Sequence, residues 1–167
     1  MGPLPDHLSF HDMLKSFLKN NGISKVHYEC LRASLNSTRP ALFYGRTKIH
    51  KLDVPLRPIV SCIGSALYNT SRHLADILSS LVGKTTSFVR NSSHFSDIVQ
   101  QEVIEQNDLL VSFDVKALYT SIPVEEAIRI AEMKLKTDSS WTDKTSLSVE
   151  NVIRLLNLCL CQSAFKF

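Results

Sequence analysis

The residue whose position most suggests chemistry is Asp114, which follows a short apolar run. Residues 109–113, LLVSF, have the composition of a buried strand, and the chain then passes through Tyr119 to Pro123, where a new helix is expected. A carboxylate beside a core strand loses its hydration, so its partner must be a metal ion, an arginine or solvent. Taken alone, the same pattern also fits an ordinary turn or helix-capping aspartate.

A second candidate lies upstream, where positive charge is concentrated. Residues 39–57 carry five basic residues against the single acid Asp53: Arg39, Arg46, Lys48, Lys51 and Arg57. Two β-prone pieces, residues 42–44 and 56–61, flank a turn region with Pro55, which predicts an extended hairpin with charged residues on its exposed side. An arginine fork held by the following Pro58 suits bidentate phosphate recognition. A basic edge strand protected from aggregation by its charges is the competing interpretation.

Helical periodicity predicts the elements that must position these residues. Four helices are expected before Asp114: two precede the hairpin and two follow it. The first runs from Ser9 to Gly22. The second turns Ile23, Val26, Cys30 and Leu31 inward, and the third runs from Ser65 to Gly83. The fourth extends from about Ser93 to Asn107, with Phe95, Ile98, Val99 and Val103 inward. Two more helices should follow Pro123, and residues 165–167 alternate like the start of a strand.

The bulk composition indicates one folded domain. The chain has 167 residues, 44% hydrophobic and 21% charged, with a formal net charge of only +3. Four cysteines show no zinc-site spacing, and no signal peptide opens the chain, so an intracellular protein is expected. The longest apolar stretch, residues 152–161, is interrupted by Arg154 and Asn157 and is too short to span a membrane.

The two candidate segments together resemble a known family. FYGRTKIHK with VPLRPIVS, followed about fifty residues later by LVSFDVKALYTSIPVEEA, is similar to the reverse transcriptases of Penelope-like retroelements. The resemblance covers residues 40–167 and implies a partial reverse transcriptase domain, the fingers and the first part of the palm. Residues 1–39 would be an N-terminal helical extension. The implied fold class is α+β, with helices packed on a small antiparallel sheet.

The resemblance also implies roles for individual residues. Asp114 matches the first catalytic aspartate, which holds two magnesium ions, with the Val115 carbonyl as a neighbouring ligand. Tyr119 matches the bulky residue that disfavours a ribose 2′-hydroxyl. Lys48 and Arg57 match residues that grip the triphosphate of the incoming nucleotide, although Thr47 stands where many relatives have proline. Arg46 and Lys51 stay open: either could track template phosphates or do nothing specific.

The sequence also lacks parts of the family's catalytic site. A GxAMGSPLSP-like segment and the Tyr-x-Asp-Asp hairpin do not occur in these 167 residues. One aspartate cannot assemble a two-metal site, so this chain alone is expected to bind Mg²⁺ poorly and to incorporate no nucleotide. The implied partners are an RNA template, a DNA primer and deoxynucleoside triphosphates. The resemblance also implies a nuclear location, and no association with a membrane is expected. The alternatives are a non-enzymatic nucleic-acid-binding remnant and a decayed retroelement fragment.

Overall fold

The computed structural model describes residues 7–37, 39–50, 52–115, 118–161 and 165–166. Its elements, in chain order, are α1 (His7–Lys19), α2 (Lys25–Leu35), β1 (Ala41–Thr47), β2 (Leu56–Ser61), α3 (Tyr68–Ser79), α4 (Ser92–Val99), α5 (Leu118–Ser121), α6 (Val124–Thr137), α7 (Val149–Cys161) and β3 (Phe165–Lys166). The combination of helices with a small, largely antiparallel sheet confirms the α+β class.

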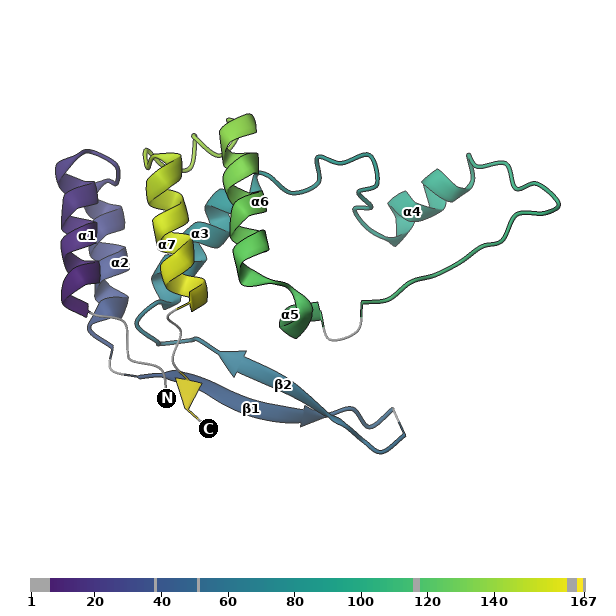
Figure 1. Ribbon diagram of the computed structural model, residues 1–167, viewed down its shortest axis with the longest axis horizontal. Helices are drawn as coiled ribbons and strands as arrows, with labels where there is room; N and C mark the ends of the chain where they lie inside the picture. Colours follow the sequence, from purple (N-terminus) through teal and green to yellow (C-terminus); the bar gives the residue numbers. More distant parts are fainter. Residues whose placement is uncertain (1–6, 38, 51, 116–117, 162–164, 167) are drawn as a thin grey trace.

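The hydrophobic core lies within a layer of five helices. Helix α1 packs on α2, α2 on α3, α3 on α7 and α7 on α6, so the first and last helices of the chain meet through α3 (Figure 1). The side chains that are almost completely buried come from four of these helices: Phe10, Leu14, Leu31, Thr70, Ile77, Val152 and Leu155. This layer is the body from which the sheet and the connecting segments extend.

Helices α1 and α2 begin and end largely as their sequences predict, but α2 presents a different face. The Ser24 side chain caps α2 by accepting the His27 backbone N–H at 3.2 Å. The buried residues of α2 are Tyr28, Leu31 and Leu35, whereas Val26 and Cys30, predicted to face inward, are exposed. Two apolar spacings overlap in this helix. The face that includes the large ring of Tyr28 buries more apolar area than the face with Val26. The Tyr28 hydroxyl also lies 3.3 Å from His11 Nε2.

The predicted hairpin is confirmed. Strands β1 and β2 pair antiparallel from Leu42 opposite Ser61 to Thr47 opposite Leu56, and β3 pairs parallel with the start of β1, giving the order β2-β1-β3. The strand start predicted at residue 165 is therefore also confirmed. Ala41 is buried beside β3, while the distal half of the hairpin extends beyond the helical layer (Figure 1).

The predicted helix over residues 93–107 is mostly wrong. Helix α4 is capped by the Asn91 side chain, which accepts the His94 N–H at 2.9 Å, but it ends at Val99. It buries no residue, and Phe95, Val99 and Val103 are all exposed. The apolar spacing is helical, but α4 lies apart from the helical layer (Figure 1), and among the described residues no helix or strand buries its apolar face.

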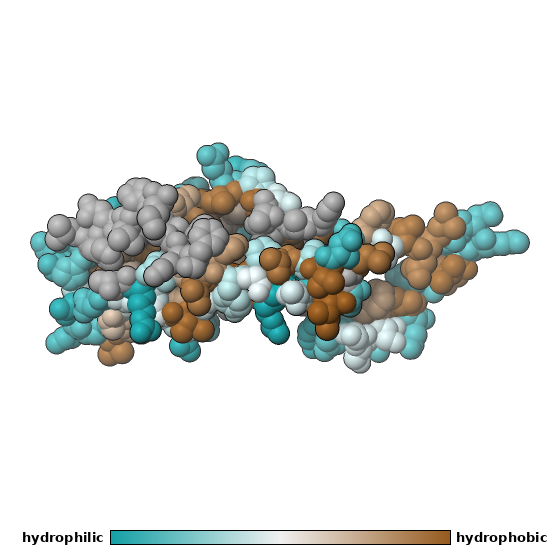
Figure 2. Space-filling model, turned by 90° about the horizontal axis from the view of Figure 1, so that it is seen from below, coloured by the Kyte–Doolittle hydropathy of each residue, from teal (hydrophilic) through white to brown (hydrophobic). Residues whose placement is uncertain are grey.

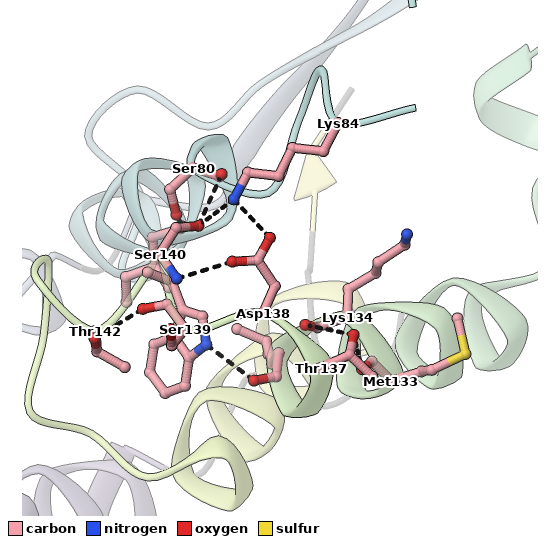
Figure 3. Close-up of polar contacts among 12 residues, drawn as sticks. Ser80, Lys84, Met133, Lys134, Thr137, Asp138, Ser139, Ser140 and Thr142 are labelled. Carbon is pink, nitrogen blue, oxygen red and sulfur yellow. Dashed lines mark hydrogen bonds and ion pairs between the residues drawn. The ribbon is translucent and has the colours of Figure 1, made fainter. Parts of the chain in front are cut away.

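The loop between α6 and α7 is fastened to the helical layer by polar contacts and one tryptophan. Trp141 is only 5% exposed and donates from Nε1 to the Leu135 carbonyl oxygen at 3.0 Å. Lys84 Nζ lies 2.6 Å from Asp138 Oδ2, and Asp138 Oδ1 accepts the Ser140 N–H at 2.8 Å (Figure 3). Ser140 also accepts from Lys84 and donates to the Ser80 carbonyl oxygen at 3.1 Å. These contacts join the segment after α3 to the end of α6.

We expect Trp141 to be a main contributor to stability. Trp141→Ala should lower the free energy of unfolding by about 3–5 kcal/mol, because it leaves a cavity and removes the hydrogen bond to Leu135. Trp141→Phe keeps much of the buried ring and should cost less. Urea unfolding followed by circular dichroism measures both variants. A loss below about 1 kcal/mol for Trp141→Ala would contradict the buried position of this side chain.

Asp138 should make the fold sensitive to acid. The hydrogen bond from Lys84, followed by that from the Ser140 backbone N–H, lowers the pKa of this carboxyl from 3.8 to about 2. The lowered pKa means that the ionised carboxylate stabilises the fold above its ordinary pKa, and that this contribution is lost as the pH falls through about 2. Asp138→Asn should therefore lower the melting temperature at neutral pH, and its difference from wild type should shrink in this acid range.

The matched control for this experiment is Asp143→Asn, an exposed carboxylate in the same loop. It should leave the pH dependence of melting unchanged. If Asp138→Asn and Asp143→Asn gave the same melting temperatures across the pH range, the Lys84–Asp138 contact would have no part in stability.

Candidate functional site

The hairpin brings Lys48 and Arg57, the two residues that the resemblance assigns to the triphosphate, close to Arg46, whose role the sequence left open. The two basic motifs form its two strands, and their register places Arg46 directly opposite Arg57. Beyond the last strand pair, the Lys48 N–H donates to the Pro55 carbonyl oxygen at 2.9 Å, so the ladder continues through the lysine. Side chains of directly opposite residues share one face of an antiparallel pair. The two guanidinium groups therefore start from the same face of the hairpin, with Lys48 just beyond them.

The electrostatics of this face favour an anion. Arg46 and Arg57 are exposed and Lys48 is half-buried. Among the ion pairs between described residues, none includes Arg46, Lys48 or Arg57. Like charges directly opposite each other in a sheet are destabilising. A phosphate bound between the two arginines would relieve this repulsion and accept hydrogen bonds from both.

The turn that closes the hairpin is conformationally strained. Asp53 and Val54 both have positive φ angles, 65° and 41°, and this region is rarely adopted by a β-branched residue such as Val54. Ile49 and Leu52 in the same turn are exposed. Lys51, for which either a contact with template phosphates or no specific role was left open, falls outside the described residues. The turn thus adds apolar side chains next to the basic face.

The buried strand expected before Asp114 is not formed. Residues 108–115 have no regular secondary structure, and Leu109 and Phe113 are 88% and 92% exposed. Phe113, the last residue of this apolar run, is therefore not part of the core, and Leu118 a few residues further on is exposed as well. An apolar run forms a strand only where a neighbouring strand satisfies its N–H and C=O groups, and in the described part of the chain no strand lies against this one.

The space-filling view shows the consequence of this open segment. Hydrophobic side chains gather at the surface over the hairpin and towards the far end of the molecule, where the chain leads away from α4 (Figure 2). The exposed large hydrophobic residues of these two regions are Leu42, Tyr44, Ile49, Leu52, Val54, Leu56, Val60, Val103, Ile104, Leu109, Leu110, Val111, Phe113 and Val115. Apolar side chains that gather at a surface are typical of interaction sites and of aggregation-prone segments.

The residues expected to hold magnesium are not gathered into a site. Asp114 and Val115 lie in the open segment and are exposed, while Tyr119 lies in α5, just before the predicted helix start at Pro123. Within the described ranges, no three His, Cys, Asp or Glu residues are grouped so that they could hold a metal ion. Magnesium needs several oxygen ligands in near-octahedral geometry, so the donor set around Asp114 does not fit it.

The sequence interpretation missed one residue of the hairpin's basic face. Tyr44 lies two residues before Arg46 on β1 and opposite Ile59 on β2, and its side chain is 42% exposed. The period of two along a strand places Tyr44 on the same face as the two arginines. This alternation was visible in the sequence, but the register was needed to show which residues of β2 share the face.

Comparisons of this chain with protein-family models, with curated proteins and with solved structures found no match. The helices of the described residues are also all too short or too polar to cross a membrane.

The open position of residues 108–115 gives a direct prediction. Phe113→Ser should change the free energy of unfolding by no more than about 0.5 kcal/mol, because an exposed side chain contributes little packing. The same substitution should reduce self-association, which light scattering measures. A buried phenylalanine would instead cost about 3–5 kcal/mol when truncated, and a loss of that size would restore the strand interpretation.

Proposed function

We propose that this chain is the fingers and the first part of the palm of a reverse transcriptase, an RNA-directed DNA polymerase like those of Penelope-like retroelements. The observation that carries the proposal is the hairpin. The two basic motifs of the resemblance lie on facing strands, and their register sets Arg46 opposite Arg57, beside Lys48. In this proposal residues 1–39 are an N-terminal helical extension, and residues 40–167 are a partial polymerase domain acting in the nucleus.

Each basic residue has a distinct task in the proposed site. Arg57 offers a planar fork of donors that matches two oxygens of one phosphate, and the following Pro58 restrains its backbone. Lys48 supplies a point charge at the end of the ladder. Together they would hold the triphosphate of a deoxynucleotide and offset the charge on the departing pyrophosphate. The proposed partners are therefore the nucleotide, an RNA template and a DNA primer.

Asp114 would act only together with carboxylates from further segments. The sequence has no two adjacent acids after Glu126, and the oxygens near Asp114 in the described chain do not form a magnesium site. We therefore propose that these 167 residues bind nucleotide but do not incorporate it. Mg²⁺-dependent primer extension by the purified chain, lost in Asp114→Ala, would contradict this part of the proposal.

The second candidate function is a non-enzymatic nucleic-acid-binding module. The exposed basic face of the hairpin favours it, because that face needs no catalytic carboxylate to bind a phosphate backbone. The affinity of such a module for template would fall steeply with rising salt and would be the same in Asp114→Asn. It would show no preference for a nucleoside triphosphate over inorganic phosphate, which separates it from the polymerase fragment.

The proposed triphosphate contact predicts the behaviour of an arginine variant. Wild-type protein should bind dTTP, and Arg57→Gln should raise the dissociation constant about tenfold or more, because a hydrogen bond to a charged group contributes roughly 1.5–3 kcal/mol. Isothermal titration calorimetry at constant ionic strength measures both. Arg154→Gln, which removes an exposed charge from α7, is the matched control and should bind like wild type. Equal losses in the two variants would indicate a nonspecific charge effect and contradict the proposed contact.

A further inference from the structure

The hairpin face that carries the two arginines also carries an aromatic ring. Because side chains alternate along a strand, Leu42, Tyr44 and Arg46 lie on one face of β1, and their partners Ser61, Ile59 and Arg57 lie on the same face of β2. Tyr44 is therefore the neighbour of Arg46 along the strand, about 6.8 Å away at the strand repeat. It is 42% exposed, so a large part of its side chain is open to a ligand.

The opposite face of the hairpin is different in character. It carries Phe43, Gly45 and Thr47 from β1, opposite Val60, Pro58 and Leu56 from β2, and none of these is charged. The Leu56 side chain lies over Gly45, since a Cβ atom at Gly45 would be 3.3 Å from both Leu56 methyl carbons. Charge and an exposed aromatic ring are thus combined on one face of the hairpin only.

We infer that this face binds single-stranded nucleic acid, with a base stacked on Tyr44 and the adjoining backbone phosphate held between Arg46 and Arg57. Proteins that bind single strands without sequence preference combine aromatic stacking platforms with positive charge along the backbone. A duplex does not fit the inference, because its bases are stacked on each other and are not free to stack on a tyrosine. The inference rests on the proposed function only in that both use the same basic face.

The open shape of the face distinguishes an oligonucleotide from a small ligand. Small molecules are bound mostly in concave sites that bury most of their surface. Tyr44, Arg46 and Arg57 instead lie on an exposed, extended hairpin, along which a strand can continue past each residue. The inference requires neither Asp114 nor a metal ion, so it assigns an activity that this chain can have by itself.

The test compares oligonucleotides with and without bases. Fluorescence anisotropy would measure the binding of labelled dT10, rU10 and an abasic ten-residue backbone with the same number of phosphates, all at low salt. Stacking is worth about 1–3 kcal/mol per base, so wild-type protein should bind dT10 and rU10 at least about fivefold more tightly than the abasic strand. Equal affinity for dT10 and the abasic strand, or no binding of either, would overturn the inference.

Three variants assign the stacking to Tyr44. Tyr44→Ala should bind dT10 no better than the abasic strand, whereas Tyr44→Phe keeps the ring and should bind like wild type. Phe95→Ala removes an exposed ring from α4 and should also bind like wild type. A preference for dT10 that survives Tyr44→Ala would overturn the inference. Loss of dTTP binding contradicts the proposed function alone, since the comparison of dT10 with its abasic form does not depend on it.

Discussion

Packing against α7 is the interaction on which the rest of this structure depends. Val152 and Leu155 of α7 are fully buried, and α7 packs against both α3 and α6. Helix α7 also leads towards β3, which pairs with the start of β1. The apolar face of one helix thus closes the core and sets where the hairpin begins. Loss of this packing would open the core between α3 and α6 and displace the helix that leads to β3.

The hairpin depends on this core at one end and on its own ladder elsewhere. Ala41 is buried and pairs with Phe165, but from Arg46 onward both strands are exposed. Its geometry there comes from backbone pairing between residues close in sequence, so the hairpin keeps its register with little tertiary support. That register is what joins two separate sequence motifs into one basic face. The basic face can therefore form while the segment around Asp114 stays open.

The contrast between local pairing and contacts among distant segments also explains which features could be predicted from the sequence. The hairpin, α6 and α7 follow from local signals: β-prone residues about a turn, Pro123 at a helix start, and helical spacing of apolar residues. The face of α2 could not be predicted, because Tyr28 and Val26 compete and only the neighbouring helices decide between them. The contact of Lys84 with Asp138 joins residues 54 positions apart, and no local pattern indicates it. For Asp114 the local signal was misleading, since an apolar run does not show whether a partner strand exists.

There is also a physical reason why the basic segment forms a site in this chain and the segment around Asp114 does not. Phosphate binding needs positive charge and rigid donors. A short hairpin supplies both from two strands that are joined by a single turn. Metal-assisted catalysis needs several carboxylates converging from distant segments, and their mutual repulsion must be offset by the ion itself. A phosphate-binding face can therefore form from residues close in the sequence, whereas a catalytic metal site requires carboxylates from the several strands of a completed sheet. In this chain the basic hairpin is paired in register and Asp114 lies in an unpaired segment, so the proposed binding of nucleic acid needs only residues that the hairpin already brings together.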